Sequence, residues 1–144
     1  MVWYANSQGR YGKSGAKGDS GERIVQSYCK YFNIKYEAKN DIVSQVHLKI
    51  DCLIEGVPVD VKSNYYKGYL AVEVEKPGKQ LGWLYTTSAV EIYGVDYRTG
   101  KIFRYKVTDM IEHVKENKSR AKICDNGSTL LWVSVNHSFI DQLL

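Results

Sequence analysis

The feature that most constrains the fold is an alternating apolar stretch at residues 48–62, interrupted by the dipeptide Glu55-Gly56. Apolar residues recur at every second position on both sides of this dipeptide, which is typical of β-strands that bury one face. Glycine readily adopts the positive φ that a tight hairpin turn requires. We therefore predict two antiparallel strands, 48–54 and 57–62, joined at Glu55-Gly56 and packed against a hydrophobic core.

Charged residues occupy the other face of this predicted hairpin. The register set by the turn places Asp51 directly opposite Asp60. It likewise places Lys49 opposite Lys62. Opposed side chains have Cβ atoms roughly 5 Å apart, so the two carboxylates either raise one pKa or bind a cation. The alternative is a solvent-facing hairpin whose charges merely pair with one another.

A carboxylate pair with an adjacent ammonium suits phosphodiester hydrolysis. Carboxylate oxygens and retained water are the ligands that Mg²⁺ prefers. A bound ion lowers the pKa of its water and neutralises phosphate charge. Lys62, on the same face as Asp60, can then steady the nucleophile or the transition state.

The order of these residues resembles the PD-(D/E)XK nuclease superfamily, which includes restriction endonucleases, Holliday-junction resolvases and phage recombination nucleases. Glu22 on a first helix, then Asp51, then residues 60–62 follow its pattern. The chain has three acid-x-Lys tripeptides, at 37–39, 60–62 and 116–118, and only the middle one follows an aspartate-bearing strand through a tight turn. Two departures are an isoleucine before the first acid, where the family motif has proline, and aspartate rather than the commoner glutamate as the second acid.

The resemblance implies a Mg²⁺-dependent DNA endonuclease, with Mn²⁺ able to substitute, that acts on branched or duplex DNA and is structure-specific in the manner of the resolvases. By resemblance, Asp51, Asp60 and the carbonyl of Val61 bind the metal, and Lys62 positions or activates water.

Two further residues take roles from the resemblance. Glu22 would bind or orient a second metal or a water; alternatively, it is a first-turn glutamate that stabilises its helix dipole. Gln45 stands where phage-type members often carry glutamine, so we expect it near the nucleic acid.

The remaining pattern predicts an α+β, or α/β-like, fold with a mixed central sheet of four or more strands flanked by helices. By resemblance this sheet is restriction-endonuclease-like. Predicted helices cover 19–32 and 108–118, and 137–144 reads as a helix or tail. Further predicted strands cover 34–39, 69–75, 89–97, 101–107 and 128–135.

Basic and aromatic side chains supply candidate nucleic-acid contacts. Residues 1–18 are Gly/Ser-rich and carry Arg10, Lys13 and Lys17. We expect either a disordered leader or a flexible basic arm that orders on a phosphate backbone, ahead of a single nuclease-like domain at 19–144. Tyr65 and Lys67 suit contacts to sugar-phosphate or an unstacked base, or form an aromatic loop packed on the domain.

Two tryptophans and two glutamates admit simpler interpretations. Trp83 and Trp132 lie in apolar segments, so we expect them in the core. Glu73 and Glu75 share one face of their strand. They either extend the acidic site, if strand order follows the sequence, or form a solvated edge.

The composition favours one cellular compartment but does not identify the binding partner. A net charge of +4 is compatible with a polyanionic partner. Three scattered cysteines and no stretch near the roughly 20 apolar residues of a membrane span favour a cytoplasmic protein with reduced thiols. A homodimer, with 129–135 as an interface, is one option. Two other functions remain open, a non-catalytic nucleic-acid-binding domain and a protein-interaction module.

Overall fold

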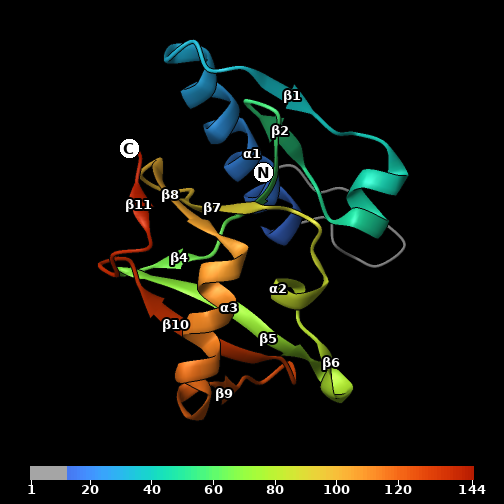
Figure 1. Ribbon diagram of the computed structural model, residues 1–144, viewed down its shortest axis with the longest axis vertical. Coiled ribbons are helices and arrows are strands. Elements are labelled where there is room, and N and C mark those ends of the chain that lie inside the picture. The colour runs from blue at the N-terminus through green and yellow to red at the C-terminus, as the bar shows by residue number, and fades with distance from the viewer. Residues whose placement is uncertain (1–12) are drawn as a thin grey trace.

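The computed structural model describes residues 13–144, which form two β-sheets and three α-helices (Figure 1). The α-helices are α1 (Lys13–Tyr31), α2 (Trp83–Thr86) and α3 (Val107–Glu116). Short helical turns of the π or 3-10 type cover Val43–Leu48, Pro77–Lys79 and Lys118–Arg120.

The first sheet holds, in spatial order, β1 (Tyr36–Ala38), β2 (Cys52–Ile54), β3 (Val57–Lys62), β7 (Glu91–Asp96), β8 (Lys101–Lys106) and β11 (Asp141–Gln142). The second sheet holds β4 (Tyr65–Tyr66), β5 (Tyr69–Lys76), β10 (Thr129–Ser134) and β9 (Lys122–Ile123), and β6 (Gln80–Leu81) pairs with β5.

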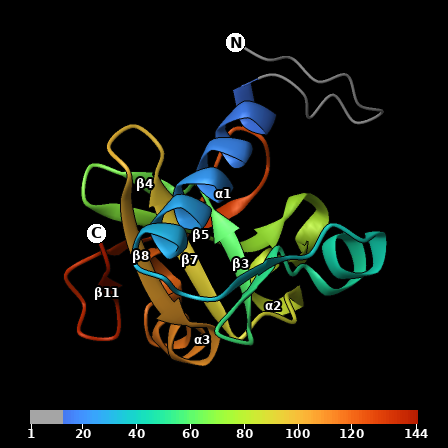
Figure 2. The ribbon, with the colours of Figure 1, turned by 90° about the horizontal axis from the view of Figure 1, so that it is seen from above.

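The first sheet separates two hydrophobic cores. One core lies between α1 and the sheet, and α1 crosses this face as Figure 2 shows; its buried members include Val25, Cys29, Cys52, Val59, Val95 and Ile102. The other core lies between the first sheet, the second sheet, α2 and α3; its buried members include Leu70, Val72, Leu84, Ile92, Phe103, Tyr105, Met110 and Leu131.

The first sheet is mixed, because β3 and β7 run parallel while its other pairs are antiparallel. Strands covered on both faces read as nearly continuous apolar runs, and Ile92 to Asp96 of β7 are all buried. The prediction of an α+β fold with a mixed central sheet flanked by helices is confirmed. The second sheet was not predicted, because period-two alternation identifies a strand without identifying the sheet that it joins.

Several predicted boundaries are wrong. α1 begins at Lys13 rather than at residue 19. β2 begins at Cys52 rather than at residue 48, because the chain forms a short π-helix over Val43–Leu48 first. The terminal segment is no helix: β11 pairs with β8, and Ile140 and Leu143 pack into the cores on opposite faces of the sheet.

Within residues 13–144, no helix combines the length and the apolar character needed to cross a membrane.

Candidate active site

The hairpin at Glu55-Gly56 forms with the predicted turn. Both turn residues have positive φ, 51° and 79°, as this tight turn requires. Ile54 pairs with Val57, and the ladder ends where Cys52 pairs with Val59. The prediction of register is confirmed for β2 itself.

The register does not continue to the aspartates as predicted. The N–H of Asp51 donates to the carbonyl of Val59 at 2.9 Å, so Asp51 is offset from direct opposition to Asp60. Lys49 is not opposite Lys62 either, because it lies in the loop before β2 with a φ of 60°. The cause is the π-helix, which ends next to Lys49 and delays the start of the strand.

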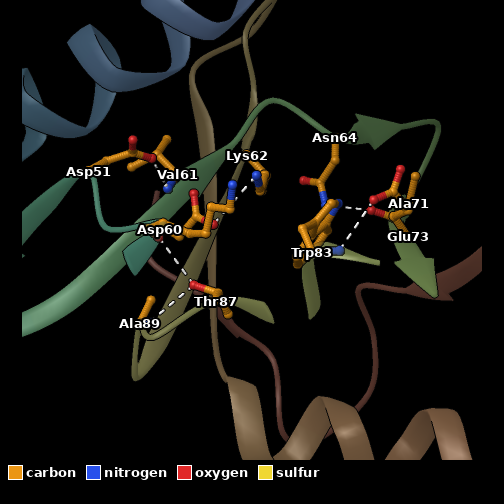
Figure 3. Close-up of polar contacts among 11 residues, drawn as sticks. Asp51, Asp60, Val61, Lys62, Asn64, Ala71, Glu73, Trp83, Thr87 and Ala89 are labelled. Atoms are coloured by element: carbon orange, nitrogen blue, oxygen red, sulfur yellow. Dashed lines mark hydrogen bonds and ion pairs between the residues drawn. The ribbon is translucent and has the colours of Figure 1, made fainter. Parts of the chain in front are cut away.

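Asp51 occupies the edge of β3 that β2 leaves unpaired. Its Oδ2 accepts a hydrogen bond of 2.8 Å from the N–H of Val61, where a strand partner would otherwise bind (Figure 3). In a strand, the N–H and C=O of one residue point to the same side. The carbonyl of Val61 therefore also faces the Asp51 side of β3.

The connection between α2 and β7 holds the loop that leads to Asp51. The N–H of Ser88 donates to the carbonyl of Leu48 at 2.8 Å, and Thr87 Oγ1 donates to the carbonyl of Lys49 at 3.1 Å. The same Thr87 oxygen accepts a bond from the N–H of Ala89. These bonds fix the position of the backbone just before Asp51.

Asp60 is a buried carboxylate. Its side chain lies on the face of the sheet opposite α1, and the residue is 4% exposed. Its Oδ2 lies 3.4 Å from Lys62 Nζ and has no hydrogen-bond partner among residues 20–144. Loss of hydration is the largest influence on Asp60 and raises its pKa to about 8, against the lowering effect of Lys62 and with a further raising effect from Asp51. A hairpin with solvent-facing charges does not fit this burial.

Lys62 is held between Asp60 and an aromatic ring. Its Nζ lies 5.0 Å from the centre of the Trp83 ring, a cation–π distance. The backbone N–H of Trp83 in turn donates to Glu73 Oε1 at 3.2 Å (Figure 3). Glu73 Oε2 accepts from Ser128 Oγ at 3.3 Å. Trp83 is thus half-buried beside the site rather than wholly in the core, a role that nothing in its apolar sequence context indicates.

Glu73 reaches this region through Trp83, not through strand order. β5 belongs to the second sheet, so the neighbours of β3 are β2 and β7. We expected Glu73 and Glu75 to extend the acidic site only if the strand order followed the sequence. The strand order does not follow the sequence here, so this condition is not met.

Glu22 lies on α1, across the other face of the sheet from Asp60. The helix approaches β3 closely, since a Cβ on Gly21 would overlap Ser63 Oγ. Burial, then Asp51 and more weakly Glu22, raise the pKa of Cys52 to about 12. The structure thus gathers Asp51, Asp60 and Lys62, and Glu22 lies with Asp51 within electrostatic reach of Cys52.

The predicted nucleic-acid contacts divide among three settings. Gln45 donates to the carbonyl of Lys39 at 2.9 Å within its own loop. Tyr65 stacks on Phe103, with ring centres 5.4 Å apart, so this ring packs on the core. Lys67 is exposed at the β4–β5 turn.

The predicted arm is described only in part. Lys13 and Lys17 lie in α1. Arg10 lies outside the described residues. The part of the arm from Lys13 onward is therefore helical backbone rather than irregular chain.

The donor set suits a hard cation with few protein ligands. In residues 20–144, no three or more His, Cys, Asp or Glu side chains are grouped to hold one ion. Among the described residues, Asp51, Asp60 and the Val61 carbonyl are the donors that the hairpin would offer to an ion. Mg²⁺ is commonly bound in this way, through one or two carboxylates plus water and substrate phosphate. The buried Asp60 Oδ2 without a hydrogen-bond partner is an acceptor that such an ion would satisfy.

The other two acid-x-Lys tripeptides have different surroundings. Glu37 and Lys39 form a surface ion pair of 3.1 Å at the edge strand, and Glu116 ends α3.

In comparisons with known proteins, no family model, no curated protein and no solved structure matches the chain.

Proposed function

We propose that the protein is a metal-dependent endonuclease of the PD-(D/E)XK superfamily that hydrolyses phosphodiester bonds in DNA. The observation that carries this proposal is the buried Asp60 beside Asp51 on the unpaired edge of β3. Its Oδ2 lies 3.4 Å from Lys62 Nζ and has no hydrogen-bond partner among the described residues. A buried carboxylate is retained in a fold when it is paired or binds a cation.

The metal would be held by Asp51, Asp60 and the Val61 carbonyl, with Mg²⁺ or Mn²⁺ as the ion. When bound, the ion would neutralise phosphate charge and lower the pKa of a water. With a pKa of about 8, Asp60 holds a proton at neutral pH in the absence of the ion, so binding of the ion would release that proton.

Lys62 would supply a positive charge at the site from a protein side chain, in addition to the charge of the ion. Because Asp60 and the Trp83 ring hold its ammonium on two sides, little reorganisation is needed when charge develops on the scissile phosphate. Lys62 would donate a hydrogen bond to the attacking water or to a phosphoryl oxygen.

The test is a cleavage panel with junction, flap, duplex and single-stranded DNA in Mg²⁺, Mn²⁺ or chelator. Removing one preorganised donor typically costs roughly 100-fold or more in rate, so Lys62→Ala should lose cleavage by that factor while DNA affinity stays within twofold. Lys115→Ala, which changes an exposed lysine on α3, is the matched control and should cleave normally.

Salt-sensitive binding without cleavage in either metal would instead indicate a non-catalytic nucleic-acid-binding domain. No affinity for DNA at low salt would indicate a protein-interaction module.

A further inference from the structure

Three large aromatic side chains lie on the outward face of the second sheet. Tyr66, Tyr69 and Trp132 are 48%, 47% and 46% exposed. Their neighbours along the strands, Leu70 and Val133, point inward and are buried in the core. Alternation along β5 and β10 therefore places these rings in solvent, and the prediction that Trp132 belongs to the core is wrong.

The three rings are close together. Tyr66 and Tyr69 are cross-strand partners of β4 and β5, and Trp132 pairs with Ala71 on the adjacent strand. The ring centres of Tyr66 and Trp132 lie 6.3 Å apart at 60°. We call these residues the aromatic face. Grouped exposed apolar side chains mark a binding surface more often than scattered ones do.

Two cations border the aromatic face. Lys67, at the tip of the β4–β5 turn, places its Nζ 5.2 Å from the centre of the Tyr66 ring. Arg98, in the β7–β8 turn, lies with its guanidinium carbon 5.6 Å from the centre of the Tyr97 ring. A hydrogen bond with Tyr97 is the main cause that raises the pKa of Arg98, and Tyr66 contributes to a smaller extent.

The acidic residues of the same strand face are at its other end and are engaged. Glu73 accepts hydrogen bonds from Trp83 and Ser128, and Glu75 accepts one from Thr129 Oγ1 at 3.4 Å. The aromatic face therefore combines flat π surfaces with positive charge, which complements a chain of bases and phosphates.

The backbone of the aromatic face follows closely on the strand of the candidate active site. Asn64, which follows the active-site strand, exchanges hydrogen bonds with Ala71: its Nδ2 donates to the Ala71 carbonyl at 2.8 Å, and its carbonyl accepts from the Ala71 N–H at 2.9 Å. An extended chain rises about 3.3 Å per residue. Tyr66 is therefore at most about 13 Å from Lys62 along the backbone, which equals the rise of about four nucleotides at the 3.4 Å spacing of a stacked strand.

We infer that the aromatic face binds unpaired nucleotides, with bases stacked on Tyr66, Tyr69 and Trp132 and phosphates near Lys67 and Arg98. The preferred substrate then carries a single-stranded segment within about four nucleotides of the bond that is cut. The statement about cleavage rests on the proposed function, whereas the statement about binding does not.

The test measures binding by the full chain in chelator, so that cleavage does not contribute. Fluorescence anisotropy compares a short oligothymidylate with a duplex of equal length. Stacking on one aromatic side chain commonly changes affinity at least about fivefold. Trp132→Ala and Tyr66→Ala should each weaken oligothymidylate binding by that factor or more and leave duplex binding within twofold. Tyr66→Phe keeps a ring and should bind normally, as should the control Tyr31→Ala, which changes an exposed ring on α1.

Three results of the binding assay overturn the inference: no binding of oligothymidylate at low salt, equal losses on duplex and single strand, or unchanged binding by both alanine variants. Sedimentation that shows a dimer lost in Trp132→Ala, with DNA binding intact, would assign the aromatic face to a second copy of the chain and also overturn it. Failure of cleavage alone, with the single-strand losses observed, refutes the nuclease proposal and leaves this inference standing.

Discussion

Replacing Asp60 by asparagine tests whether the buried Asp60 carboxyl lowers the stability of the metal-free protein. Asp60 is buried, and its pKa is raised from an ordinary 3.8 to about 8, first by desolvation. Between these two pH values the folded chain keeps a proton that the unfolded chain has lost. Unfolding then releases a proton, so the stability of the metal-free protein falls as pH rises through this window and levels off above about pH 8.

The size of the effect follows from the width of the window. One unit of pH corresponds to about 1.4 kcal/mol for a group protonated in the folded state alone. From pH 5 to pH 7 the folded protein therefore loses about 3 kcal/mol through Asp60. Asparagine does not titrate, so the stability of Asp60→Asn relative to the wild type should rise by this amount over the same interval.

The assay is urea unfolding at pH 5, 6 and 7 in the presence of a chelator, followed by circular dichroism. A difference between Asp60→Asn and wild type that stays constant within about 0.5 kcal/mol would refute the argument, because it would mean that Asp60 is charged in the folded state. Asp96→Asn is the matched control. Asp96 is also buried, but it accepts bonds from the Arg98 N–H and Thr99 Oγ1. Its replacement removes a carboxylate that is already hydrogen-bonded and should lower the free energy of unfolding at pH 7.

Two further substitutions test the support around Lys62. Trp83→Leu removes the ring under the Lys62 ammonium and should lower the cleavage rate between about twofold and thirtyfold, with DNA affinity unchanged; Trp83→Phe should recover most of the rate in the same assay. Gly82→Ala would place a Cβ against the carbonyl of Glu73 and should lower the free energy of unfolding by about 1–3 kcal/mol, measured by urea titration, since backbone atoms cannot rotate away. An unchanged midpoint for Gly82→Ala would contradict the close packing of this turn.

The hairpin shows how much of the strand register a local sequence pattern can predict. Alternation and the Glu55-Gly56 turn were sufficient for the register of Ile54 with Val57, because two adjacent strands and a short turn leave few arrangements. The same reasoning failed three residues farther on, at Asp51. There a π-helix, tied through Leu48 and Lys49 to a distant connection, decides where the strand begins.

The aromatic residues show the opposite case. Tyr65 and Tyr66 are adjacent and identical, yet one stacks on Phe103 and the other faces solvent. Which ring is buried depends on the side of β4 that the first sheet covers. Trp132 looked like a core residue for the same reason, since an apolar strand does not state which of its faces has a partner.

The sequence by itself determined the tight hairpin, the α+β class and the nearness of Asp60 and Lys62, all of which follow from chain geometry over a few residues. Only the tertiary structure decided that Asp60 is desolvated, that Trp83 lies against Lys62 and that β5 joins a second sheet. Burial and the choice of strand neighbours depend on contacts between distant segments, whose free energies no local pattern encodes.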